Sequence, residues 1–243
     1  MKATILSALF MSLFVTGCAT TGDNPQDPYE SFNRSMWEFN KGLDKAILRP
    51  VAKGYKAITP DPVEKGVTNF FNNIDEVPTI INDVLQFKFG KALKDTGRFL
   101  INSTLGVAGL FDPATDMGLE REEEDFGQTL AVWGFDSGAY LMLPFFGPSS
   151  VRDGIGSGVQ ATSFYSLYDE LNDKQTEYIL KYGIDIVQTR AAILSIDEQL
   201  ESAPDDYTFL RDVYLQNRKF KIYDGNPPIE DDECEFEEDC EEF

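Results

Sequence analysis

Apolar side chains recur along this sequence at the spacing of one face of an α-helix. The first stretch begins at Asp27, a suitable N-cap, with Pro28 at the first helical position, and Arg49-Pro50 predicts its end. Asn33 and Asn40 interrupt or flank its apolar face. That face consists of Phe32, Met36, Phe39, Leu43 and Ile47. The pattern predicts a chain that folds mainly into amphipathic helices.

The pattern continues through two more parts of the chain. Asp61 predicts a helix start followed by Pro62, and Gly90 predicts a bend between two helices. Asp205-Asp206 opens the last helix. The apolar positions are Val63, Val67, Phe70, Phe71, Ile74, Val77, Ile80, Ile81, Val84, Leu85, Leu93, Phe99 and Leu100, and, before the last helix, Tyr178, Ile179, Tyr182, Ile186 and Ile193. An apolar stripe is more often a core face than a membrane face, so most of these residues are expected in the core.

The middle of the chain has a different character. Residues 105–119 and 130–159 are rich in Gly, Pro and large apolar residues and poor in charge, which predicts extended or hairpin structure. Residues 119–128 between them read as a solvated acidic loop. Aromatic residues crowd the apolar segments, as suits a protein at the headgroup level of a bilayer. They are Trp37, Trp133, Tyr140, Phe145 and Phe146.

The first residues predict export. Lys2 precedes an apolar run that ends at Val15, and this run is shorter than the roughly 17 to 25 residues of a bilayer-spanning helix. Residues 1–17 therefore read as a signal peptide. Val15-Thr16-Gly17 before Cys18 resembles the bacterial lipobox, in which the peptide is cut before the cysteine and the cysteine receives lipid. The alternative is an ordinary signal with a chance cysteine. Residues 18–26 are small and polar and would form a tether.

Charge and cysteine content describe the other end of the chain. The net charge is −21, and residues 224–243 hold eleven acidic side chains and no basic one. We expect this tail to be disordered and the acidic protein to repel nucleic acid. In an oxidising compartment Cys234 and Cys240 either form a disulfide or remain free thiols.

The residues that common enzyme chemistries need are missing. The chain contains no histidine, which removes the commonest general base, the usual zinc ligand and every triad that runs through imidazole. No phosphate-binding loop, dinucleotide fingerprint, metal-spaced cysteine set or G-x-S-x-G motif is present. The sequence predicts a protein that is not an enzyme and has no cofactor or metal.

Several long sequence motifs, in the same order along the chain, resemble those of the MlaA/VacJ lipoproteins of Gram-negative bacteria. They span Asp27 to Tyr223 and include DPYESFNR, RPVAKGY, VTNFFNNIDEVPTIINDVLQ, RFLINSTLGVAGLFDPA and YLMLPFFGPSSVRDG. The resemblance implies a mostly α, ring-like single domain of amphipathic helices with a short hairpin-like Gly/Pro-rich segment around a central channel. It also implies lipid anchoring at the periplasmic leaflet of the outer membrane.

The function implied by the resemblance is phospholipid transport without catalysis. Mislocalised phospholipids would leave the outer leaflet through the channel and pass to the periplasmic carrier MlaC, with a trimeric porin holding the protein in place. The first alternative is an envelope lipoprotein that assembles or scaffolds porins, and the second is a lipid hydrolase. Copurified phospholipid favours transport, copurified porin alone favours assembly, and released lysophospholipid would favour the hydrolase.

The resemblance also assigns roles to particular residues. Cys18 matches the lipidated cysteine, and Ala19 after it favours the outer membrane. Gly134, Gly138 and Gly147 are candidate hinges of a loop beside the channel. The candidate lipid- or porin-facing residues are Ile80, Ile81, Val84, Leu85, Phe87 and Phe89. The acidic tail matches no family motif.

Overall fold

The structure, a computed structural model, describes residues 24–171 and 175–228, excepting the side chains of residues 164–182. The expected signal peptide, Cys18, Cys234 and Cys240 lie outside these residues. The elements are α2 (Glu30–Leu43), the π-helix η1 (Asp44–Leu48), α3 (Arg49–Ile58), α4 (Asp61–Leu85), α5 (Phe89–Thr104), α6 (Pro113–Asp116), α7 (Phe126–Val132), β1 (Tyr140–Leu143), β2 (Gly147–Ser150), α8 (Val151–Leu171), α9 (Gln175–Ala192), the 3₁₀-helix η2 (Leu194–Ile196), α10 (Asp197–Ser202) and α11 (Asp206–Ile222).

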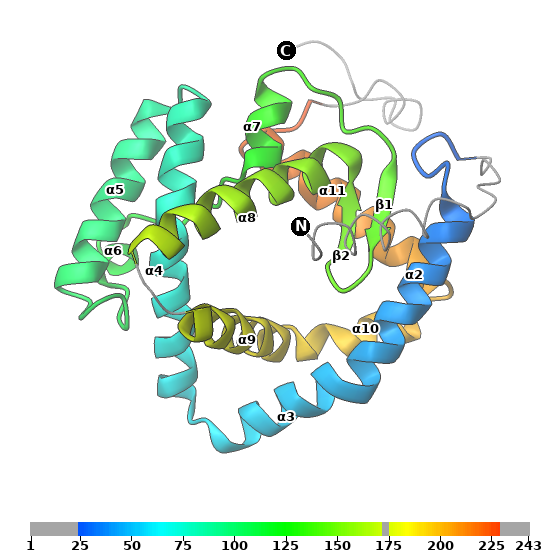
Figure 1. Ribbon diagram of the computed structural model, residues 1–243, viewed down its shortest axis with the longest axis horizontal. Coiled ribbons are helices and arrows are strands. Elements are labelled where there is room, and N and C mark those ends of the chain that lie inside the picture. The colour runs from blue at the N-terminus through cyan, green and yellow to red at the C-terminus, as the bar shows by residue number, and fades with distance from the viewer. Residues whose placement is uncertain (1–23, 172–174, 229–243) are drawn as a thin grey trace, which may run out of the picture.

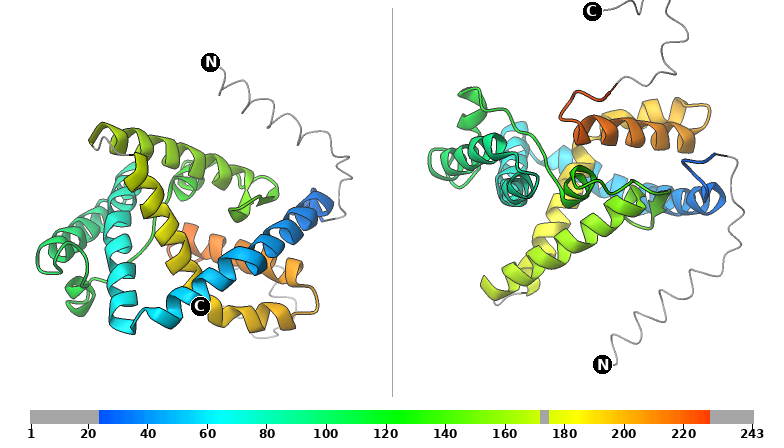
Figure 2. Two further views of the ribbon diagram at one scale, coloured as in Figure 1. Left: turned by 60° about the horizontal axis from the view of Figure 1, so that its bottom comes forward. Right: turned by 90° about the horizontal axis from the view of Figure 1, so that it is seen from above.

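The helices are arranged as a ring, which confirms the expected mostly α, single-domain architecture. In Figure 1 α2 and α3 form one side of the ring, α4 and α5 the opposite side, and α8 and α9 lie between them. Seen from above in Figure 2, α11 lies on one face of the ring, and the ends of α8 and α9 project from the other. The only sheet in the described part of the chain is an antiparallel hairpin in which Tyr140 pairs with Ser150 and Leu143 with Gly147.

The expected N-cap role of Asp27 is wrong. Helix α2 begins at Glu30, and Tyr29 occupies the N-cap position. The buried Asp27 carboxylate instead accepts hydrogen bonds from Asn33 Nδ2 at 2.8 Å and from the Tyr207 hydroxyl at 2.5 Å. Asp27 therefore connects the start of the domain to α11, a partnership that local sequence does not reveal.

Arg49-Pro50 does not end the first helix either. The π-helix η1 joins α2 directly to α3, and the Arg49 N–H donates to the carbonyl of Asp44, five residues earlier. Pro50 lies in the first turn of α3. A widened π-turn is one of the recognised ways in which a long helix changes its hydrogen-bond pattern and direction. The helical path therefore continues where the proline predicted a stop.

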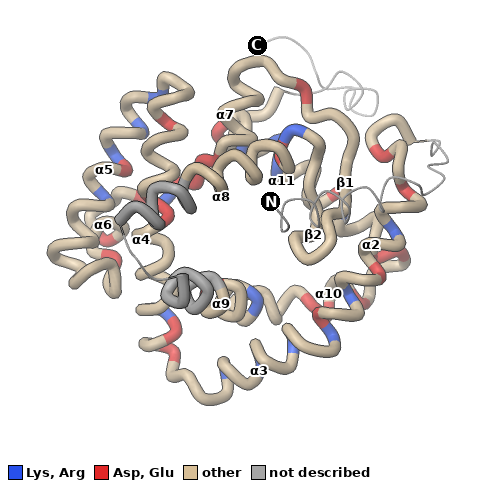
Figure 3. The backbone as a smooth tube through the Cα atoms, viewed as in Figure 1, with Lys and Arg blue, Asp and Glu red and all other residues tan. Residues whose placement is uncertain are grey.

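A charged cluster holds this junction to the C-terminal helices. Arg190 of α9 donates to the Asp44 carboxylate at 2.7 Å and to Asp197 of α10 at 2.7 Å. Arg49 donates to Glu201 of α10 at 2.5 Å. Figure 3 shows residues of both charges close together around α10. The junction at η1 is thus joined by ion pairs to two helices that follow it by more than 140 residues in the chain.

The bend expected at Gly90 occurs instead at residues 86–88. Gly90 lies within the first turn of α5, and α4 continues through Pro78 to Leu85. The turn is closed by hydrogen bonds from the Lys88 N–H to the Asp83 carbonyl at 2.9 Å and from the Phe87 N–H to the Val84 carbonyl at 3.1 Å. This is the Schellman pattern. Phe87, at φ 61°, occupies the left-handed position that usually belongs to glycine.

The middle of the chain is only partly extended. The predicted hairpin is present in β1 and β2, but residues 126–132 and 151–171 form helices α7 and α8. Helix α8 crosses α7 at Gly156, where an added Cβ would lie 2.6 Å from the backbone nitrogen of Gly127. A glycine that signals a loop in the sequence is therefore a helix-packing contact in the fold.

We expect Gly156→Ala to destabilise the fold by about 1–3 kcal/mol, because its methyl group would meet the backbone of α7. Gly158→Ala is the matched control in the same helix, since its Cβ would meet nothing within 4 Å. A helical Gly→Ala change without a clash is stabilising by about 0.5–1 kcal/mol. Urea denaturation of both variants would measure the difference, and equal effects would contradict the packing contact.

The compact apolar core lies beside the hairpin. Tyr140, Met142 and Tyr207 are buried together. The partly buried residues packed against them are Met36, Trp37, Leu210, Tyr214 and Leu215. Tyr140 is therefore a core residue and does not lie at the headgroup level. Trp133, Phe145 and Phe146 are exposed, as that expectation requires.

Candidate functional site

The helical hairpin of α4 and α5 reverses the usual distribution of polar and apolar side chains in a protein. Polar and charged side chains point inward, and large apolar side chains are exposed to the surroundings. The buried polar residues of the two helices are Asn73, Glu76, Thr79, Asn82, Asp83, Asp95, Arg98 and Asn102. The exposed apolar ones are Val63, Phe70, Ile81, Val84, Phe89, Leu93 and Leu100. A large exposed apolar surface marks a contact with a membrane or another protein.

The six candidate lipid- or porin-facing residues lie at one end of this hairpin. Ile81 and Val84 are exposed near the end of α4, Phe87 in the turn is 74% exposed, and Phe89 begins α5. The remaining two, Ile80 and Leu85, are half-buried. The rings of Phe87 and Phe89 are in edge-on contact, with centroids 6.2 Å apart. These residues form one continuous apolar end.

A buried ion pair organises the inner side of the hairpin. Arg98 Nε donates to Glu76 Oε1 at 2.9 Å, and both side chains are 1% exposed. Arg98 also donates to the hydroxyl of Thr115 at 3.1 Å and to the carbonyl of Leu119. Burial raises the pKa of Glu76, although Arg98 beside it acts in the opposite direction. Arg98 thereby fastens α6 and the following loop to α5.

The acidic segment at residues 119–128 is not a fully solvated loop. Glu124 is buried, and its carboxylate accepts hydrogen bonds from Gln86 at 2.9 Å, from Gln128 at 2.6 Å and from Lys88 at 3.0 Å. Asp125 is the N-cap of α7. The expectation of a solvated face or loop is wrong at Glu124, because polar side chains from α7 and from the turn at residues 86–88 surround it.

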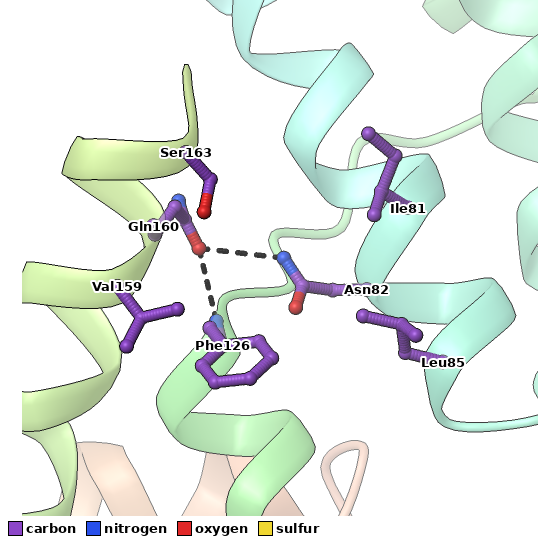
Figure 4. Close-up of a pocket in the computed structure, with 7 residues that line it drawn as sticks. All are labelled: Ile81, Asn82, Leu85, Phe126, Val159, Gln160 and Ser163. Carbon is purple, nitrogen blue, oxygen red and sulfur yellow. Dashed lines mark hydrogen bonds between the residues drawn. The ribbon is translucent and has the colours of Figure 1, made fainter. Parts of the chain in front are cut away.

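A small cavity of 190 Å³ lies where α4, α7 and α8 meet. Its apolar wall includes Ile81 and Leu85 of the exposed apolar end (Figure 4). Gln160 Oε1 accepts hydrogen bonds from Asn82 Nδ2 at 3.3 Å and from the Phe126 N–H at 2.9 Å. The other lining residues are Val159 and Ser163. The cavity therefore combines an apolar wall with a polar side.

A second, larger cavity of 940 Å³ lies between α11 and the segment from α7 to the hairpin. Gly134 and residues 135–137 form one of its walls. Charges of both signs line it, including Arg152, Arg218 and Asp212. Arg218 is held at 2.8 Å from Asp153. This space suits a zwitterionic or polar group better than an apolar one.

The hairpin beside this cavity is held by α2. The side-chain amide of Asn33 donates to the Tyr140 carbonyl at 3.0 Å, and its oxygen accepts from the Met142 N–H at 2.8 Å. Asn40 donates to the Leu143 carbonyl at 2.9 Å and accepts from the Phe145 N–H at 2.8 Å. The two asparagines on the first helical stretch thus bind the free edge of β1.

The three candidate hinge glycines border this hairpin. Gly134, Gly138 and Gly147 have φ values of 92°, 65° and 83°, in the left-handed region that favours glycine. An added Cβ would meet nothing within 4 Å at Gly134 or Gly147, but at Gly138 it would lie 3.1 Å from Val151. The positions suit turns, and their role as hinges remains a prediction.

Two features are absent from the part of the chain that the structure describes. No helix there is long and apolar enough to cross a bilayer. The same residues contain no cluster of three or more His, Cys, Asp or Glu side chains that could hold a metal ion.

Comparison with known proteins decides the family. The family model for the MlaA lipoprotein matches residues 25–221. The chain belongs to the MlaA lipoprotein family. The Haemophilus influenzae protein named intermembrane phospholipid transport system lipoprotein MlaA is 35% identical over 230 residues, covering 91% of each chain. The Escherichia coli K12 protein of the same name is 34% identical over 223 residues, covering 88% of this chain and 87% of its own length.

The fold agrees with that of a solved relative. A structure described as the structural basis for maintenance of bacterial outer membrane lipid asymmetry matches with a TM-score of 0.70 and 33% sequence identity. The match covers 82% of this chain and 99% of the solved one. The ring-like helical fold is therefore one that this family is known to adopt.

Sequence reasoning missed the polar inner side of the α4–α5 hairpin. Glu76, Asp83 and Asn73 recur at the same helical spacing as the apolar residues. The helix therefore has two stripes, and hydrophobic patterning assigns the apolar stripe to the core by default. One feature of the sequence could have revealed the reversal. Several amide and carboxyl side chains share one face of α4, and Arg98 of the next helix is a potential partner for them.

Proposed function

We propose that this protein is an outer-membrane lipoprotein that removes mislocalised phospholipids from the outer leaflet and passes them to a periplasmic carrier. The observation that supports this function most directly is the reversed polarity of the α4–α5 hairpin. Exposed apolar residues on a helix pair with a buried polar side suit a protein embedded in one leaflet with a polar interior. The MlaA relatives bear the name of an intermembrane phospholipid transport system.

The two cavities suit the two parts of a phospholipid. The cavity beside Ile81 and Leu85 opens next to the exposed apolar end and would accept part of an acyl chain, whereas the larger cavity with Arg152 and Asp212 would accept a polar headgroup. A headgroup needs a polar path, because a charged group crosses hydrocarbon only at high cost. The space enclosed by the ring would be that path, and no catalytic step is needed.

The remaining parts of the proposal concern the ends and the partners. Residues 1–17 would be removed, Cys18 would be lipidated on the periplasmic leaflet, residues 18–26 would be a tether, and residues 224–243 an acidic tail. The apolar end around Phe87 would face lipid or a trimeric porin. The soluble carrier MlaC would receive the phospholipid.

The test is native mass spectrometry of the detergent-purified full chain, with Val159→Trp as the variant that fills the small cavity. We expect the wild-type protein to copurify with phospholipid and the variant to lose most of it. Val63→Trp, at an exposed site in α4, is the control and should retain lipid. Copurified porin without phospholipid would contradict transport and favour the assembly alternative.

Charge on the apolar end tests its contact with the bilayer. We expect Val84→Lys combined with Phe87→Lys to reduce the retention of the protein in membranes, because a lysine in hydrocarbon costs about 2.5–3.5 kcal/mol. Lys56→Met is a control away from this end, at a side chain that is 51% exposed. Flotation of vesicles measures retention in the absence of the lipid anchor. Equal flotation of the three proteins would show that the end does not contact lipid.

A further inference from the structure

Two carboxyl groups lie buried between α4 and α5. Asp83 and Asp95 are both 0% exposed. None of their four carboxyl oxygens has a hydrogen-bond donor among the described residues when both groups are ionised. Lys94 Nζ lies 3.9 Å from Asp95 Oδ1, too far for a hydrogen bond. A buried carboxylate without a donor is strongly disfavoured, so one of the groups needs another way to be satisfied.

The two side chains can satisfy each other. They come from two helices that pack against each other, and each carboxyl group acts on the pKa of the other as its side-chain hydrogen-bond partner. Two carboxylates at this separation repel, whereas a carboxylic acid donates a strong hydrogen bond to a carboxylate. Protonation of one group therefore converts the repulsive pair into a link between the helices.

We propose that Asp83 and Asp95 hold one proton between them and that this shared proton joins α4 to α5, so that the hairpin loosens as the proton is lost. Asp83 follows Asn82 in α4, and Asn82 lines the small cavity that is the candidate lipid site. The hairpin would then respond to pH at a place where its movement reaches the lipid-contacting end. The proposal does not depend on the transport function.

The charged surroundings of the pair come from α5 and from the acidic segment. Asp83 is influenced by Lys91 and by Glu124, and Asp95 by Lys94, Arg98 and Glu122. The cations have other carboxylate partners: Lys91 contacts Asp224 and Glu122, Lys94 contacts Glu122, and Arg98 contacts Glu76. None of them satisfies the pair. Burial is the main cause that raises the pKa of Asp83 to about 7, and the hydrogen bond with Asp95 acts in the same direction.

The sign of the pH effect follows from this. The unfolded chain releases the Asp83 proton near pH 4, whereas the folded protein keeps it until about pH 7. Between these values the folded state holds more protons, so raising the pH destabilises it. One retained proton makes the unfolding equilibrium constant rise by up to tenfold per pH unit. The loss is complete above about pH 7.

The experiment compares Asp83→Asn with wild type in the purified full chain between pH 4.5 and 8. Asparagine supplies the hydrogen-bond donor at every pH. The free energy of unfolding of the variant should therefore depend less on pH than that of wild type, by the equivalent of about one proton. Asp95→Asn should do the same and serves if Asp83→Asn does not fold. Asp116→Asn, at an exposed carboxylate, should follow wild type. Hydrogen exchange at residues 80–98 should increase with pH in wild type only.

Two results would overturn the proposal. In the first, Asp83→Asn and Asp95→Asn keep the wild-type dependence on pH. In the second, Ca²⁺ or Mg²⁺ stabilises the wild-type protein at pH 8 and a chelator destabilises it at pH 6, because a bound divalent cation would then satisfy the pair in place of the proton. An infrared carboxylic-acid band present in wild type at pH 6 and absent from Asp83→Asn would support it directly.

Discussion

Arg98→Met should lower the free energy of unfolding by about 3–5 kcal/mol. The change removes the buried partner of Glu76, since both side chains are 1% exposed. It leaves the carboxylate only the more distant Arg121, whose Nε lies 3.9 Å from Glu76 Oε1. The carbonyl of Leu119 and the hydroxyl of Thr115 lose their donor as well. Urea denaturation of the detergent-purified protein, followed by circular dichroism, measures the loss.

The control is Arg34→Met, at an arginine whose side chain is 40% exposed and donates to both carboxylate oxygens of Asp205. Because water can solvate the groups that lose this partner, we expect the variant to lose clearly less stability than Arg98→Met, about 1 kcal/mol. Adding Glu76→Gln to Arg98→Met should recover part of the loss, because the uncompensated charge is then removed. An equal loss in the Arg34 and Arg98 variants would show that the polar side of the hairpin is not buried as described.

Asn33→Leu should lower the free energy of unfolding by about 2–5 kcal/mol. Leucine has the same number of side-chain heavy atoms as asparagine and branches at the same carbon, but it leaves the Tyr140 carbonyl and the Met142 N–H buried without a partner. Each unsatisfied buried group costs about 1–3 kcal/mol. The Asp27 carboxylate also loses one of its donors. Hydrogen exchange at Met142, together with denaturation, would locate the effect in β1.

Asn69→Leu provides the comparison, because Asn69 makes one hydrogen bond, to the Leu110 carbonyl at 3.2 Å, at an exposed position. Its loss should cost less than about 1 kcal/mol. If Asn33→Leu has an effect as small as this, the hydrogen bonds of Asn33 between α2 and the β1–β2 hairpin do not stabilise the fold.

The local sequence predicted the helical stretches well and their ends less well. Asp205 is the N-cap of α11 as expected, since its side chain accepts from the Tyr207 and Thr208 N–H groups. The same kind of signal failed at Asp27, because a tertiary partner, Tyr207, takes that carboxylate. It failed again at Gly90, where the chain turns at Phe87. Local sequence predicts a cap or a turn correctly only when no distant group competes for the same side chain.

The candidate site was less accessible to sequence reasoning. Ile81, Val84, Phe87 and Phe89 were expected to face lipid or porin through the family resemblance, and the structure shows them exposed. Nothing in their spacing distinguishes a lipid-facing stripe from a core stripe, because the free energy of burial depends on the surrounding medium and not on the helix itself. Glu124, which sequence reasoning left in a solvated loop, is buried because Gln86 and Lys88, more than 30 residues earlier in the chain, donate hydrogen bonds to it.

The sequence by itself determined that this chain is helical, that it lacks the histidine of common catalytic sites, and that it belongs with the MlaA lipoproteins. Helix periodicity and the sequence motifs of a family depend only on the order of residues along the chain, so they can be recognised without a structure. Only the tertiary structure decided that the polar stripe of α4 and α5 faces inward, and that the Asp83 and Asp95 carboxyl groups are buried without a donor. Burial and pairing of polar groups depend on which segments the fold brings together, and the sequence order does not state this.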